Sequence, residues 1–122
     1  MIIKVSAKAG YGSTRKLLNI CCDDLINHKK VIFITNTIDY QEWLGYIDAI
    51  VGKENLNYFR PVYAKDLNAA FEVLPYIDKT PYDVIALDRY PLMDGDLTDI
   101  AQYLSPNGAI IYTEQLPADS IL

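Results

Sequence analysis

The stretch Ser6–Lys16, SAKAGYGSTRK, joins an apolar strand to a helix and decides which kind of α/β fold the sequence can form. The preceding residues Ile2–Val5, IIKV, are typical of a short buried strand. From Thr14 onwards apolar residues recur at three- and four-residue steps, the period of a helix with one buried face. A glycine-containing turn that leads into a helix points backbone N–H groups and the positive end of the helix dipole at one place. The stretch therefore predicts a turn suited to binding an anion.

The rest of the chain alternates between strand and helix patterns. Four further apolar stretches predict strands at Val31–Thr35, Leu56–Val62, Tyr82–Asp88 and Ala109–Thr113. Between them lie three more helical patterns, one over Tyr40–Val51 and two that begin at the expected caps Asp66 and Asp96. Pro75 is expected to follow the third helix, and Ser105–Gly108, SPNG, to form a turn before the last strand. The alternation predicts an α/β fold, a three-layer αβα sandwich with a mainly parallel five-stranded sheet.

Length and composition favour one soluble domain. The chain has 122 residues, 51% of them hydrophobic, and we expect a single domain over residues 1–116 with a short C-terminal tail at 117–122. A net charge of −5 argues against direct binding to nucleic acid or to an anionic membrane. The adjacent Cys21 and Cys22 are spaced neither for a disulfide nor for a zinc site, which favours a reduced cytoplasm. The abundance of Tyr, Ile, Asn, Lys and Asp hints at an AT-rich genome such as that of a phage.

The phosphate-binding loop pattern G-x-x-x-x-G-K-[ST] falls on Ala7–Thr14. Gly12 and Thr14 match the pattern, but Ser13 stands where the pattern has lysine. The lost charge-assisted hydrogen bond to phosphate is worth about 1.5–3 kcal/mol. A variant of the loop carries an extra lysine, and Lys8 with Gly10 fits that variant, so Lys8 can supply the missing charge. The expected phosphate-binding residues are Lys8, Gly10, Gly12, Ser13 and Thr14.

With this loop placed, a second stretch carries a family resemblance. DVIALDRYPLM, Asp83–Met93, resembles the Walker B strand of the DnaB-type replicative helicases, members of the RecA-like superfamily of P-loop NTPases. In that family the aspartate at the end of the strand, here Asp88, binds Mg²⁺ directly or through water. AIIYTEQL, Ala109–Leu116, is similar to their later strand, with Gln115 in the place of the sensor glutamine. The resemblance implies a RecA-like P-loop fold, with ATP and Mg²⁺ as the ligands of Asp88, Gln115 and the loop.

The departures from this family imply a domain that binds without catalysis. Ser13 replaces the loop lysine, and Asn36 and Thr37 stand where RecA-like ATPases have a catalytic glutamate. We therefore expect no catalytic residues, no metal site of the chain's own and a degenerate, non-hydrolysing loop. The function implied is a binding protein that modulates another protein, such as a related ATPase or helicase. The alternative is a weak ATP binder or NTPase that uses Lys8 or a cation from its partner.

A second resemblance leads to a different function. The segment from Tyr63 to Glu114 is similar to the second half of a Rossmann-type, SAM-dependent methyltransferase, with Asp66 in the place of the acidic residue that approaches the adenine. The front of the chain departs from that family, because Ser6 and Asn36 stand where it has acidic residues. A reduced methyltransferase fold therefore remains an alternative, and titration with ATP and with SAM would separate the two families.

Overall fold

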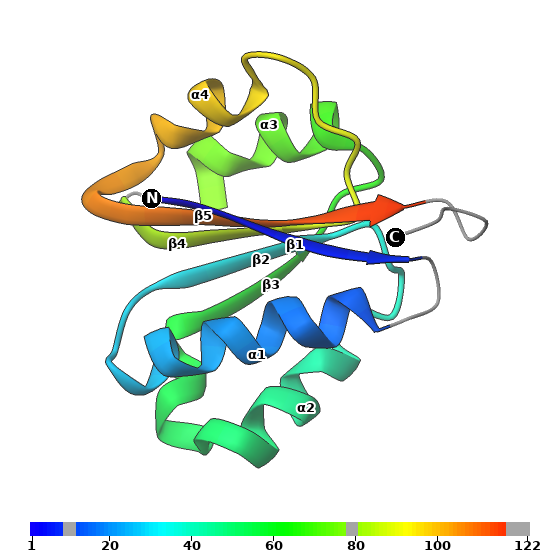
Figure 1. Cartoon of the computed structure of the whole chain (residues 1–122). Helices are drawn as coiled ribbons and strands as arrows, with labels where there is room; N and C mark the ends of the chain where they lie inside the picture. Colours follow the sequence, from blue (N-terminus) through cyan, green and yellow to red (C-terminus); the bar gives the residue numbers. More distant parts are fainter. Residues whose placement is uncertain (9–11, 78–80, 117–122) are drawn as a thin grey trace.

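A computed structural model describes residues 1–8, 12–77 and 81–116 as a five-stranded parallel sheet between two layers of helices (Figure 1). The strands are β1 (Ile2–Lys8), β2 (Val31–Thr35), β3 (Phe59–Tyr63), β4 (Tyr82–Asp88) and β5 (Leu104–Leu116). The helices are α1 (Ser13–Ile26), α2 (Glu42–Val51), the 3₁₀ helix η1 (Lys53–Tyr58), α3 (Leu67–Ile77) and α4 (Asp96–Ala101). All neighbouring strands are parallel, in the order β1-β5-β4-β2-β3. The predicted α/β fold with a parallel five-stranded sheet is confirmed.

Each face of the sheet is covered by its own pair of helices. α1 and α2 pack on one face and α3 and α4 on the other, as Figure 1 shows below and above the sheet. The strand β2 contacts both helix layers: Phe33 packs among residues of α1 and α2, while Ile32 and Ile34 pack towards α3. All five residues of β2 are buried, which explains why its sequence is apolar without alternation. Two separate cores therefore hold the central strands in place.

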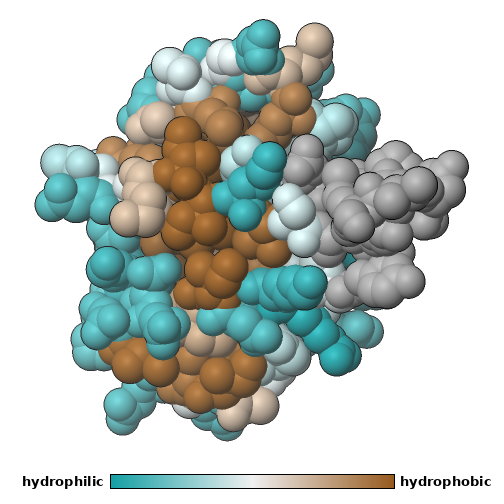
Figure 2. All heavy atoms as spheres, viewed as in Figure 1, coloured by the Kyte–Doolittle hydropathy of each residue, from teal (hydrophilic) through white to brown (hydrophobic). Residues whose placement is uncertain are grey.

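β1 forms one edge of the sheet and pairs only with β5. Brown, apolar surface gathers at the front of Figure 2, where Figure 1 shows β1, and Ile2 on this strand is 56% exposed. Lys4 lies exposed on the same strand, and a charged side chain on an edge strand opposes pairing with other chains.

Among the helices of the described residues, none combines the length and the apolar character needed to cross a bilayer.

The two predicted acidic caps have different outcomes. Asp66 caps α3 as expected, since its Oδ1 accepts a hydrogen bond of 2.8 Å from the backbone N–H of Ala69. The prediction for Asp96 is wrong, because Gly95 is the N-cap residue and Asp96 is the first residue of α4. Gly95 has a φ of 91°, a conformation that glycine adopts without strain. The Asp96 carboxylate instead closes the turn before the helix, accepting 2.6 Å from the N–H of Met93.

Several predicted boundaries are also wrong. The first strand continues beyond Val5 to Lys8, and the third begins at Phe59 rather than Leu56, because Lys53–Tyr58 form η1. α3 does not end before Pro75 but runs through it to Ile77. Proline removes one intrahelical hydrogen bond, and its position in the last turn limits the damage to that single bond. The last strand begins at Leu104 rather than Ala109, so the predicted turn Ser105–Gly108 lies inside β5. A shift in register accommodates these residues, because Tyr82 pairs with Leu104 and Val84 already pairs with Ala109.

Replacing Gly108 with alanine is expected to destabilise the protein by about 1–3 kcal/mol, since neighbouring atoms leave no room for an added methyl group. A Cβ atom there would lie 3.0 Å from the Cβ of Leu104 and 3.1 Å from the backbone oxygen of Asp83. Gly45 in α2 is the matched control, because a Cβ would meet nothing within 4 Å there. Gly45→Ala is expected to stabilise the protein by up to about 1 kcal/mol. Urea denaturation measures both, and equal effects of the two substitutions would contradict the prediction.

Candidate functional site

Polar residues converge at the carboxyl ends of the central strands. Thr35 ends β2 and Asp88 ends β4, and the two are direct partners in the register of the sheet. Thr113 lies near the carboxyl end of β5, and Thr14 lies in the first turn of α1, which packs across this part of the sheet (Figure 1). All four are buried, Asp88 completely. A parallel sheet brings these residues together because its strands all end at the same edge.

Asp88 is the centre of this cluster. The hydroxyl of Thr14 donates to both carboxylate oxygens of Asp88, at 2.9 Å to Oδ1 and 3.0 Å to Oδ2. The hydroxyl of Thr35 donates to Oδ2 at 2.9 Å, and the Thr35 oxygen accepts in turn from the N–H of Thr37 at 3.2 Å. The carboxylate therefore links the first turn of α1 to two neighbouring strands. It holds the start of the helix that follows the loop against the sheet.

Burial raises the pKa of the Asp88 carboxyl above its ordinary value of 3.8, because desolvation disfavours the charged form. The hydrogen bonds from Thr35 and Thr14 oppose this shift, as do the positive charge of Arg89 and a hydrogen bond from Thr113. The pKa stays raised in spite of these partners. Ionising Asp88 in the folded protein therefore costs more free energy than ionising it in water, because desolvation outweighs the favourable hydrogen bonds and the charge of Arg89.

This raised pKa gives Asp88 a defined effect on the pH dependence of stability. As the pH rises above 3.8, the unfolded chain loses this proton first, so the contribution of Asp88 to stability falls until the folded-state pKa is passed. We expect the free energy of unfolding of the wild type, minus that of Asp88→Asn, to decrease between about pH 4 and pH 7. The decrease is about 1.4 kcal/mol for each unit of pKa difference. Urea denaturation across this range measures it, and a difference that rises with pH would contradict the assignment.

The structure brings part of the predicted phosphate site together. Gly12 precedes α1 with a φ of 76°, so this position favours glycine, and no side chain caps the helix. Ser13 and Thr14 follow as buried residues of the first turn, and Thr14 meets Asp88 as described above. Gly10 lies outside the described residues. Lys8 ends β1 and Gln115 lies in β5, but their side chains lie outside the described part of the chain.

Sequence reasoning missed Thr35, Arg89 and Thr113. Arg89 has a φ of 68°, and its backbone N–H donates to the Thr113 hydroxyl at 2.7 Å. The amide of Asn36 donates to the backbone oxygen of Arg89 at 3.2 Å, which ties the ends of β2 and β4 together. The sequence does place a threonine at or near the end of each strand that flanks β4. This pattern indicates a shared site only when the order of the strands is known, because β2 and β5 are not consecutive in the chain.

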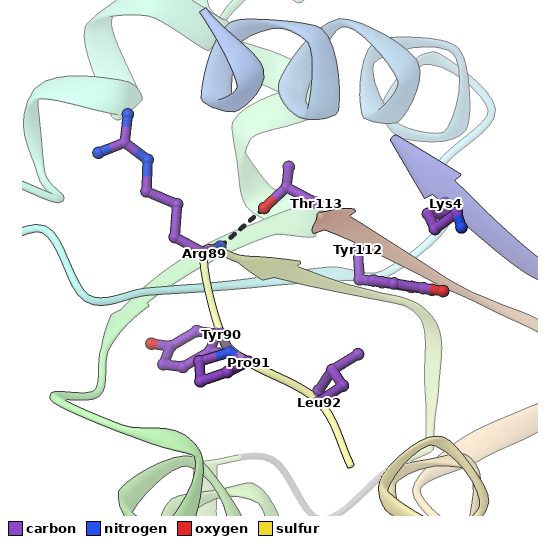
Figure 3. A pocket seen from close by; sticks show the side chains of 7 residues that line it. All are labelled: Lys4, Arg89, Tyr90, Pro91, Leu92, Tyr112 and Thr113. Carbon is purple, nitrogen blue, oxygen red and sulfur yellow. Dashed lines mark hydrogen bonds between the residues drawn. The ribbon is translucent and has the colours of Figure 1, made fainter. Parts of the chain in front are cut away.

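A hollow of about 440 Å³ lies beside this cluster (Figure 3). Its lining consists of Lys4, Arg89, Tyr90, Pro91, Leu92, Tyr112 and Thr113. Lys4 and Tyr112 are register partners on β1 and β5. Figure 3 shows the Arg89 side chain directed away from Pro91 and Leu92, so Arg89 borders the hollow through its backbone while its guanidinium lies elsewhere. The volume lies within the range of small-molecule sites, about 300–1,000 Å³.

The residues described by the structure contain no group of three or more His, Cys, Asp or Glu side chains arranged to hold a metal ion. No protein-family model matches the chain, and no curated protein matches it either.

Proposed function

We propose that this chain is a non-catalytic binding domain of the RecA-like P-loop type, which acts on a protein partner such as a related ATPase or helicase. One observation carries the proposal: the Thr14 hydroxyl is bonded to both oxygens of a completely buried Asp88. The resemblance to DnaB-type helicases places these two residues, which are 74 positions apart in the chain, around the same ligand. Their contact in the folded chain supports that resemblance.

The burial and the hydrogen bonds of the Asp88 carboxylate support a binding role rather than catalysis. Both oxygens of Asp88 accept hydrogen bonds from threonine hydroxyls, and the residue has no exposed surface. A carboxylate that holds Mg²⁺ must offer an oxygen to the ion or to its water. Ser13 brings no charge to the loop, and Asn36, in the place of the family's glutamate, bonds to the backbone of Arg89. Asp88 then serves as a fixed link between α1 and the sheet.

The strand order favours this proposal over a methyltransferase. In the Rossmann arrangement, 3-2-1-4-5-6, the first strand lies in the centre of the sheet, between the second and fourth. Here β1 lies at the edge, and β4 is the direct neighbour of β2. A Rossmann-type site for SAM needs the first strand and its glycine-rich turn at the centre. This order therefore argues against the methyltransferase alternative.

Enzymatic assay and ligand titration test the proposal with the purified protein. We expect no ATP hydrolysis, and no rise in melting temperature at about 1 mM SAM, because only a ligand that binds the folded state raises stability. ATP turnover that is abolished by Asp88→Ala would overturn the proposal. A rise in melting temperature with ATP that requires Mg²⁺, and that Ser13→Lys increases, would favour the alternative of a weak nucleotide binder.

The partner is tested by affinity capture from the cells in which the protein occurs. Recovery of an ATPase or helicase of the RecA-like class is the expected result. The purified domain is then added to the recovered ATPase. An ATPase activity that does not change would contradict a modulating role.

A further inference from the structure

The helix that follows β2 covers one face of the sheet, whereas the helices that follow both of its neighbours, β3 and β4, cover the other face. After β2 the chain enters α2, which packs with Phe33 and Val84 on one face. After β4 it enters α4, whose Ile100 packs with Ile85 on the other face. Such a divergence opens a crevice outside the carboxyl ends of the two strands, and open α/β sheets bind their ligands there. Arg89 is the first residue after β4, and its neighbour Asp88 pairs with Thr35 at the end of β2, so Arg89 follows the strand pair at its carboxyl end.

Arg89 has a strained backbone conformation and an unsatisfied hydrogen-bond donor. Its φ of 68° lies in the left-handed region, which residues other than glycine rarely adopt. Two hydrogen bonds fix the strained backbone, from the Arg89 N–H to Thr113 and from the Asn36 amide to the Arg89 oxygen. The Arg89 Nε is buried and has no hydrogen-bond partner. Backbone strain and an unsatisfied buried donor at one residue are features of functional sites, because folding alone would favour their removal.

The guanidinium also keeps its charge available. Figure 3 shows it extended away from Tyr112 and Leu92, to the side of the chain opposite the hollow. Within the described part of the chain it forms no ion pair. The nearby Asp88 is enclosed by Thr14 and Thr35, whose hydroxyls already satisfy its oxygens. A cation without a paired carboxylate at the carboxyl ends of the strands, where open α/β sheets bind their ligands, is suited to an anion from outside the chain.

We propose that Arg89 binds a phosphate group of a small ligand in the crevice between the ends of β2 and β4. The planar guanidinium presents parallel N–H donors that match two oxygens of a phosphate. The hydrogen bonds from Asn36 and to Thr113 hold the backbone of Arg89, so the side chain is oriented before the ligand arrives. This inference is independent of the proposed function, because it needs neither the loop before α1 nor magnesium.

The test is a titration of the ¹⁵N-labelled full chain with inorganic phosphate, followed by NMR at the Arg89 Nε–H signal. Sodium chloride at matched ionic strength controls for screening, and acetate distinguishes phosphate from carboxylate recognition. We expect a saturable shift of this signal with phosphate alone. Arg89→Gln is expected to weaken binding at least about tenfold, the loss expected for one charge-assisted hydrogen bond.

Arg89→Gly separates a ligand-binding role from a structural one. Glycine relieves the strained φ and removes the unsatisfied Nε, so we expect a higher melting temperature together with lost phosphate binding. His28→Gly is the matched control, because His28 is the other described non-glycine residue with positive φ, at 60°, and stacks on Tyr58. It should leave phosphate binding unchanged.

Three results would overturn the inference. These are a shift of the Arg89 signal with chloride of the same size, binding of acetate as tight as that of phosphate, and unchanged phosphate affinity in Arg89→Gln. A lower melting temperature for Arg89→Gly would also count against it, since it would show that Arg89 supports the fold. ATP hydrolysis by the wild type would overturn the proposed function and leave this site intact, so the two proposals fail separately.

Discussion

Asp88→Ala is expected to lower the free energy of unfolding by about 3 kcal/mol, because it leaves buried hydroxyl groups without an acceptor. Thr14 and Thr35 both donate to this carboxylate, and each would have to find another partner in the interior. The substitution also leaves a space at a position with no exposed surface. The loss of the link should loosen the first turn of α1 from the sheet. Urea denaturation at neutral pH measures the change.

Two control variants separate these causes. Asp88→Asn keeps the size of the side chain and one oxygen acceptor, so we expect it to cost less than Asp88→Ala. Asp94→Ala removes an exposed carboxylate from the loop before α4 and should change stability by less than about 0.5 kcal/mol. If Asp88→Ala were as stable as the wild type, Asp88 would have no structural role, and the proposal of a fixed link would fail.

The sequence was sufficient to predict the layers of this fold but not all of its boundaries. Periodicity predicted the central strands, because a fully buried stretch such as Val31–Thr35 has few other arrangements open to it. Pro75 and the residues Ser105–Gly108 are local breakers, and tertiary packing overrode them. Tyr82 pairs with Leu104 across the sheet, which extends β5 through residues that in isolation favour a turn. Local preferences are therefore unreliable where pairing on both sides of a short segment includes it in a strand as an irregularity.

The site was predictable only where one sequence pattern covered it. Thr14 and Asp88 each belonged to a motif, so their contact could be expected. Thr35 belongs to no motif, and Arg89 and Thr113 lie inside stretches that resemble the helicases without an expected role there. All three join the site because β2 and β5 flank β4. Strand order is a long-range property that depends on which helices cover which face, and periodicity does not contain it. The strain at Arg89 was equally out of reach, since it depends on hydrogen bonds to two other segments.

Phe33→Ala is expected to lower the free energy of unfolding by about 3–5 kcal/mol, through lost burial and the cavity that remains. Phe33 lies at the middle of β2, has no exposed surface and stacks on Phe59 with ring centroids 6.0 Å apart. Domains of this size are stable by about 5–15 kcal/mol, so this loss is a large fraction of the total stability. Ile38→Ala is the control: Ile38 is 79% exposed, and its removal should cost less than about 0.5 kcal/mol. Urea denaturation measures both variants. A cost below about 1 kcal/mol for Phe33→Ala would mean that Phe33 is not tightly packed between β2 and the helices α1 and α2, because truncating a buried Phe in a packed core costs about 3–5 kcal/mol.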